Sequence, residues 1–93
     1  MSRTLLTEEQ ITQRLKELKD WTRAGKEIKK TVKRKDFVQA MGFVTSVAIL
    51  AEKMDHHPDI DIRWNAVHLT LSTHSAGGLT EYDFNLAKQI DEL

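Results

Sequence analysis

The sequence predicts an α+β fold, a two-layer sandwich in which helices cover one face of a four-stranded antiparallel sheet. Hydrophobic residues recur every three or four positions in three stretches, and they alternate with polar residues in the stretches between them. The resulting order is helix, two strands, helix, two strands, helix. Strands joined by short turns pair antiparallel. The apolar faces of the helices are then expected to pack on one face of the sheet. We expect the 93 residues to form one domain, 1–93.

The first helix is expected over residues 8–19. Thr7 and Gln10 have the spacing of a capping box, and apolar residues follow them at helical intervals. A β-hairpin should come next, with strands at 21–24 and 27–34 and a glycine in the turn between them.

A long second helix is expected over residues 37–54, because Asp36 is a suitable N-cap and a broad apolar stripe follows it. We expect that stripe to lie on the core. It comprises Phe37, Ala40, Met41, Val44, Val47, Ala48 and Ala51. Pro58 lies beyond the end of this helix, and two strands at 61–64 and 67–74 follow. Their alternation slips by one residue, which indicates a tight turn or a bulge.

The last helix should begin at Thr80, after the Gly77-Gly78 pair. Thr80 and Asp83 again have capping-box spacing, and apolar residues then run along one side. Asp83 therefore has a structural role available to it whatever else it does.

Composition restricts the classes of function. Fourteen basic and fourteen acidic residues give a formal net charge of zero, which argues against a dedicated nucleic-acid or anionic-membrane binder. The absence of cysteine excludes a thiol nucleophile, a disulfide scaffold and a thiolate metal site. No signal-peptide segment or membrane-length apolar run is evident. We therefore expect a cytoplasmic protein with no membrane partner.

Three histidines lie where chains commonly present functional groups. His56 and His57 are adjacent at the end of a predicted helix, and His74 ends a predicted strand. Glu52 lies one helical turn before His56, so its carboxylate could orient an imidazole, and Asp83 could do the same. The sequence leaves simpler roles open for each of them, namely exposed loop histidines and a helix cap.

Other kinds of site find weaker support. Histidines and a carboxylate could coordinate zinc, but the H-x-H and H-x-x-x-H spacings are absent. Ser72 and Ser75 lack the context of a nucleophile elbow, and there is no glycine-rich phosphate loop.

Residues 23–36 carry seven basic and two acidic residues, a net charge of +5. That segment could contact phosphates or be a solvated hairpin. Ile62 and Trp64 alternate with polar residues, so Trp64 is expected to lie in the core rather than to contact a ligand.

Several motifs occur together in the order of one known family. Residues 52–58 read EKMDHHP, Trp64 follows six residues after the proline, residues 72–74 read STH, and residues 78–83 read GLTEYD. In these motifs the chain resembles the pterin-4a-carbinolamine dehydratases. Their pattern is E-K-x-x-H-H-P, an aromatic residue, T-H at a strand end, and G-L-T/S-x-x-D before the last helix. The resemblance extends over about 21–93.

The resemblance implies a lyase that removes water from 4a-hydroxytetrahydropterin, giving quinonoid dihydropterin for tetrahydropterin recycling. It implies no metal and no organic cofactor, a β-β-α-β-β-α fold after a leading helix, and a homodimer or homotetramer assembled through the sheets. An animal relative also partners a homeodomain transcription factor. The alternative function is therefore a protein-interaction or coactivator module that uses the basic hairpin or a helix surface, without direct contact to nucleic acid. Ile60 replaces a tryptophan of some relatives, which affects one ring-packing contact and not the chemistry.

The resemblance also assigns catalytic roles. His56 and His74 would be the acid–base pair, His57 would fix the substrate near its 4a position, and Asp83 would orient a histidine. Histidine suits proton transfer because its ordinary pKa, about 6.5, lies near working pH. The substrate-binding residues implied are Glu52, Asp55, Pro58, Trp64 and Thr73, with Glu52 and Asp55 as supporting groups and Trp64 as a wall of the pterin pocket.

Overall fold

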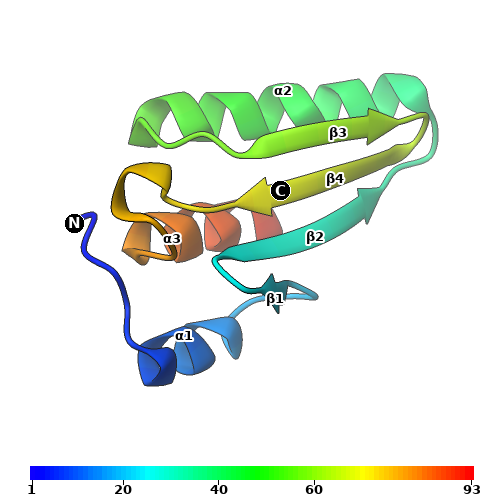
Figure 1. Ribbon diagram of the computed structural model, residues 1–93. Helices are drawn as coiled ribbons and strands as arrows, with labels where there is room; N and C mark the ends of the chain where they lie inside the picture. The colour runs from blue at the N-terminus through cyan, green and yellow to red at the C-terminus, as the bar shows by residue number, and fades with distance from the viewer.

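The computed structural model describes all 93 residues. Its elements are α1 (Glu8–Leu15), β1 (Thr22–Ala24), β2 (Glu27–Lys33), α2 (Phe37–Met54), β3 (Asp59–Arg63), β4 (Ala66–Leu71), the short 3-10 turn η1 (His74–Ala76) and α3 (Glu81–Asp91). The strands form one antiparallel sheet in the order β1-β2-β4-β3 (Figure 1). The predicted α+β fold is confirmed.

Helix α1 begins with the predicted capping box but ends four residues before the predicted boundary. The Thr7 hydroxyl accepts from the Gln10 N–H at 3.2 Å, and the Gln10 side chain accepts from the Thr7 N–H at 2.9 Å. Beyond α1 the Lys19 N–H donates to the Asp91 carboxylate at 2.8 Å, and Asp20 has a left-handed backbone, with φ 62°. This tie to α3 draws residues 16–20 out of the helix.

The carboxylate of Asp91 joins the hairpin to the last helix. Asp91 Oδ1 accepts from Lys30 Nζ at 2.7 Å and from Trp21 Nε1 at 2.8 Å. The Lys30 side chain is largely buried, so a solvated hairpin is the wrong description for Lys30. Its register explains the difference, since Lys30 pairs with the buried Leu69 and shares that residue's face of the sheet.

The sheet buries one face beneath helices α2 and α3. Ile28, Val67, Leu69 and Leu71 are fully buried on this face, and α2 packs against both β4 and α3. The slip in alternation is a tight turn between β3 and β4, where Trp64 has φ 51°. Because this left-handed residue leaves the strand alternation, its side chain is 68% exposed. The expectation that Trp64 lies in the core is wrong.

Helix α2 begins at its predicted N-cap, where the Asp36 carboxylate accepts from the Gln39 N–H at 2.9 Å. The residues of α2 that are buried in the core are Ala40, Phe43, Val47 and Ala51. The predicted stripe was too wide, because Phe37, Met41 and Ala48 are exposed. A single layer beneath α2 can cover only one row of its side chains.

By length and composition alone, α2 could cross a membrane, since its 18 residues have a mean hydropathy of 1.3. That is weak evidence for a membrane span, because the core helix of a soluble domain has the same character. Here the buried row of α2 packs against the sheet and α3.

Candidate functional site

A cleft of about 200 Å³ lies where the end of α2, the start of β3 and the turn η1 meet. In Figure 1 these segments lie on the side of the molecule that also holds the N-terminus. The cleft is lined by Arg3, Asp55, His56, His57, Asp59, Ser72, Thr73, His74 and Ser75. All three histidines that the sequence singled out therefore border one space, although 16 residues separate His57 from His74 in the chain.

His56 reaches the cleft because the chain reverses direction at Asp55. Asp55 caps α2 in the left-handed conformation, with φ 52° and ψ 45°. The next N–H, that of His56, still donates to the Ala51 carbonyl at 3.1 Å, which closes the helix end. The His56 side chain is thereby turned inward, where only 6% of the residue is exposed.

The buried imidazole of His56 faces the buried carboxylate of Asp83. His56 Nε2 lies 2.6 Å from Asp83 Oδ1, and Asp83 is fully buried. A carboxylate in this position fixes the orientation of the ring and its tautomer, and it stabilises positive charge on the ring. The structure therefore brings Asp83 to a histidine, as the resemblance implied.

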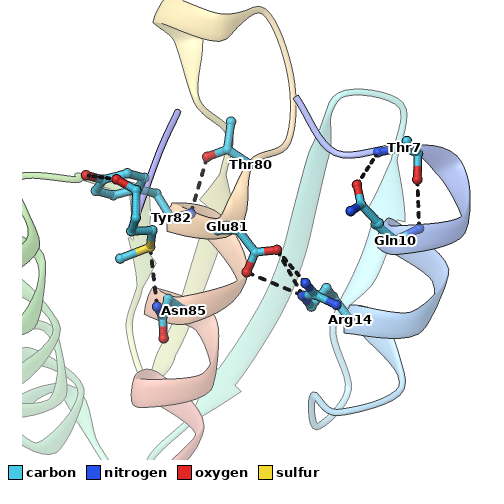
Figure 2. A network of polar contacts seen from close by, with 8 residues as sticks. Thr7, Gln10, Arg14, Thr80, Glu81, Tyr82 and Asn85 are labelled. Carbon is cyan, nitrogen blue, oxygen red and sulfur yellow. Dashed lines mark hydrogen bonds and ion pairs between the residues drawn. The ribbon is translucent and has the colours of Figure 1, made fainter. Parts of the chain in front are cut away.

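The second carboxylate oxygen of Asp83 is held by the start of α3 and the end of β4. Asp83 Oδ2 accepts from the Thr80 N–H at 2.9 Å and from the Thr73 hydroxyl at 2.8 Å. The Thr80 hydroxyl lies 2.7 Å from that of Thr73, and it also accepts from the Tyr82 N–H at 3.3 Å (Figure 2). Thr73 borders the cleft, but its hydroxyl is used inside the protein. Asp83 thus serves as a helix cap and as the partner of His56 at once.

His57 pairs with the carboxylate that the sequence placed near His56. His57 Nε2 lies 2.6 Å from Glu52 Oε1, and both side chains are largely exposed. The reversal at Asp55 turns His56 away from the helix surface and leaves His57 on it. An exposed pair of this kind contributes little to stability, so the Glu52 carboxylate chiefly restrains the direction of the His57 ring.

His74 enters the cleft because the chain leaves the sheet after Leu71. Thr73 makes an isolated antiparallel bridge to Gly78, and residues 74–76 curl into η1 within that bridge. The His74 residue is exposed, and its ring forms no hydrogen bond within the chain. Of the three cleft histidines, His74 is the one with an imidazole uncommitted to a carboxylate.

The structure does not bring every predicted residue into the cleft. Pro58 follows His57 but is not among the lining residues. Trp64 lies at the opposite end of β3, so one chain alone does not place it as a wall of the pocket.

Three lining residues lie outside the motifs that the sequence analysis singled out: Arg3, Asp59 and Ser75. Asp59 and Ser75 each lie next to a motif, which is the only signal for them. Nothing in the sequence indicates that Arg3 would reach the cleft.

A second hollow, of about 510 Å³, runs along α1 and is lined only by residues of that helix. It gathers no groups from distant segments, so it offers no chemistry comparable to that of the histidine cleft. The His, Asp and Glu side chains nowhere form a group of three or more that could hold a metal ion.

Comparison with known proteins gives a consistent result. The sequence profile of the family "Pterin 4 alpha carbinolamine dehydratase" matches residues 4–93. Curated relatives bear the provisional name pterin-4-alpha-carbinolamine dehydratase. The relative from Nocardia farcinica is 57% identical over 100% of this chain and 98% of its own length. The relative from Sulfolobus acidocaldarius is 46% identical over 95% and 97%.

Solved structures agree with this result. A transcriptional coactivator/pterin dehydratase from Brucella melitensis superposes with a TM-score of 0.90 at 38% identity, covering 94% of this chain and 95% of that one. A pterin dehydratase-like RuBisCO assembly factor of the alpha-carboxysome shares the fold, with a TM-score of 0.67 at 24% identity. Because the family profile and the relatives cover nearly the whole chain, the chain belongs to the pterin-4-alpha-carbinolamine dehydratase family and is a hydro-lyase.

Proposed function

We propose that the cleft dehydrates 4a-hydroxytetrahydropterin by histidine acid–base catalysis, in the cytoplasm, as a step in tetrahydropterin recycling. One dehydratase domain, residues 1–93, would carry the reaction. The observation that supports this most is the buried His56–Asp83 pair bordering the same cleft as His57 and the unpaired imidazole of His74. Two imidazoles in one cleft suit a reaction that moves two protons in opposite directions.

The reaction breaks the C4a–O bond and the N5–H bond of the substrate. The electrons of the N5–H bond form the N5=C4a double bond, and the hydroxyl departs as water after it gains a proton. Hydroxide is a poor leaving group, so one imidazole of the His56/His74 pair gives the hydroxyl its proton and the other accepts the proton from N5. Asp83 supports His56 whenever that ring carries positive charge.

The remaining lining groups would hold the pterin. His57, restrained by Glu52 at 2.6 Å, can hydrogen-bond the substrate near the 4a position. Asp55 and Asp59 offer acceptors at the mouth of the cleft, which match the N–H groups of a pterin ring. These acceptors and donors lie around a space that is open to solvent on one side.

The proposal predicts that the wild-type protein accelerates the decay of freshly generated 4a-hydroxytetrahydropterin. Positioned acid–base groups contribute about 10²- to 10⁴-fold in rate, so the spontaneous decay should be clearly exceeded at catalytic amounts of protein. Stopped-flow absorbance, with and without protein, measures the difference. A folded wild-type protein that leaves the decay rate unchanged would exclude the proposed activity.

A homodimer or homotetramer, assembled through the sheets as the resemblance implies, is proposed as the assembled form, and the exposed face of α2 would be a second contact surface. Val38 is 78% exposed and Ile49 is 54% exposed, on the helix side that faces away from the sheet. Apolar side chains gathered on one helix face, next to the exposed Met41, are typical of a surface that is covered in an assembly. The same face would serve a coactivator role, the second candidate function, which the printed name of the Brucella melitensis protein includes for that protein.

The assembly proposal predicts that Ile49→Glu lowers the molar mass in solution. A buried carboxylate without a partner opposes association strongly, so light scattering after size-exclusion chromatography should show a smaller species. Gln13→Glu adds the same charge to exposed α1 and should leave the mass unchanged. If Ile49→Glu keeps the wild-type mass, the α2 face is not a contact surface of the assembly.

A further inference from the structure

The N-terminal segment, residues 1–6, lies against the start of α3 and reaches the cleft. The Leu6 N–H donates to the Leu79 carbonyl at 3.0 Å, and the Tyr82 hydroxyl donates to the Met1 carbonyl at 3.4 Å. Figure 2 shows Tyr82 projecting from the first turn of α3 toward this segment. The segment is thus attached on both sides of Arg3.

Arg3 is fixed by two independent contacts. Its Nη2 donates to the Asp55 carbonyl at 2.8 Å, and its guanidinium carbon lies 4.1 Å from the centroid of the Tyr82 ring. The Tyr82 ring in turn lies 5.6 Å from the ring of the buried His56. Tyr82 therefore lies between Arg3 and the proposed acid–base group His56, with the two rings tilted by 51°.

The guanidinium of Arg3 meets no carboxylate inside the protein. Arg14, Arg23 and Arg63 each form an ion pair with a carboxylate, whereas Arg3 forms none and donates one hydrogen bond, to a neutral carbonyl. Arg34 also forms no ion pair, but it does not line the cleft. The remaining N–H groups of Arg3 have no acceptor in the chain, and the residue lines the cleft. A guanidinium that is fixed in place and has free donors is suited to binding an oxygen of a ligand.

We infer that Arg3 is a substrate-positioning residue that donates to the C4 carbonyl of the pterin ring, with Tyr82 as its platform; this rests on the proposed dehydratase function. C4 is bonded directly to C4a, the carbon that loses the hydroxyl. In a substrate whose 4a-hydroxyl lies among the histidines, the C4 carbonyl oxygen is only two bonds from C4a and therefore lies close to the same groups. Arg3 is the one lining cation other than the histidines, and a charge-assisted hydrogen bond to that carbonyl would set the ring's orientation.

The test compares Arg3→Ala, Arg3→Lys and the control Arg63→Ala in the stopped-flow assay. Loss of one hydrogen bond to a charged donor should raise KM about tenfold in Arg3→Ala, with kcat nearly unchanged, because the bond is present in both ground and transition states. Arg3→Lys keeps a charged donor and should recover part of the affinity. Arg63 lies at the far end of β3, so its replacement should change neither constant.

A second substrate shows whether Arg3 contacts the pterin ring or its side chain. The increase in KM should be equal for the 4a-carbinolamines of tetrahydrobiopterin and 6-methyltetrahydropterin, because they share the ring carbonyl and differ in the side chain. An increase confined to tetrahydrobiopterin would overturn the assignment to the ring carbonyl, and an unchanged KM beside an active wild type would overturn any role of Arg3 in binding.

Calorimetric titration with 7,8-dihydrobiopterin separates this inference from the proposed function. Binding should weaken about tenfold in Arg3→Ala and stay constant in Arg63→Ala. If the wild type bound this pterin but did not accelerate the dehydration, the proposed activity would fail. The affinities of the wild type and Arg3→Ala would still show whether Arg3 binds the pterin. Equal affinity of Arg3→Ala and the wild type would overturn the inference directly.

Discussion

His74→Ala is expected to lower kcat for 4a-carbinolamine dehydration by about 10²- to 10⁴-fold, the contribution of a positioned acid or base. The reason is that His74 carries one of the two imidazoles proposed to transfer protons, and the variant has no imidazole at that position. Because His74 is exposed in η1, its removal leaves no buried cavity. The midpoint of thermal unfolding, Tm, should therefore stay close to that of the wild type, and stopped-flow absorbance should report the loss of turnover.

His68 provides the matched control. It lies on β4 outside the cleft, and its ring nitrogen Nδ1 is 2.8 Å from the Thr31 hydroxyl on the uncovered face of the sheet. His68→Ala removes the same side chain from the same protein and should keep wild-type turnover. Wild-type turnover in His74→Ala would remove His74 from the acid–base pair, and an equal loss in both variants would show that the effect is not specific to the cleft.

The sequence identified the residues of the cleft better than their pairing. Adjacent histidines before a proline marked a helix end, and capping-box spacing marked the start of α3, so the positions of His56, His57 and Asp83 could be predicted. Which carboxylate meets which histidine depends on one backbone angle. The positive φ of Asp55, 52°, turns His56 inward to Asp83 and leaves His57 for Glu52. An aspartate at that position does not indicate a left-handed backbone conformation, so the pairing of the histidines with the carboxylates could not be predicted.

Other features depend on tertiary contacts, which the hydrophobic periodicity of the sequence does not reveal. Helix α2 is apolar on two sides, so the pattern could not distinguish the row on the sheet from the exposed row that includes Met41. Trp64 fits the alternation of its strand but occupies the turn, where its left-handed backbone exposes it. Arg3 lies in a segment without periodicity, and it meets Asp55, 52 residues away, only through the fold.

Asp83→Ala is expected to destabilise the protein by about 3–5 kcal/mol, the cost of breaking a buried hydrogen-bonded charge. Its fully buried carboxylate accepts from the Thr73 hydroxyl and the Thr80 N–H and lies 2.6 Å from His56 Nε2. Alanine leaves these polar groups without an acceptor in a space that excludes water. Urea unfolding followed by circular dichroism measures the loss.

Glu52→Gln is the control for Asp83, since it also alters a carboxylate that lies 2.6 Å from a histidine, but at the surface. Its free energy of unfolding should stay within about 1 kcal/mol of the wild type. An Asp83→Ala protein as stable as Glu52→Gln would contradict the buried network.

Asp83→Asn separates the two roles of this carboxylate. The amide keeps one oxygen, which can still accept from Thr73 and Thr80, so part of the stability should return. The charge opposite His56 is lost, however, and the amide nitrogen cannot stabilise positive charge on the imidazole. A folded Asp83→Asn protein with low kcat would therefore assign the charge of Asp83 to the proton transfer, and one with wild-type kcat would confine Asp83 to capping α3.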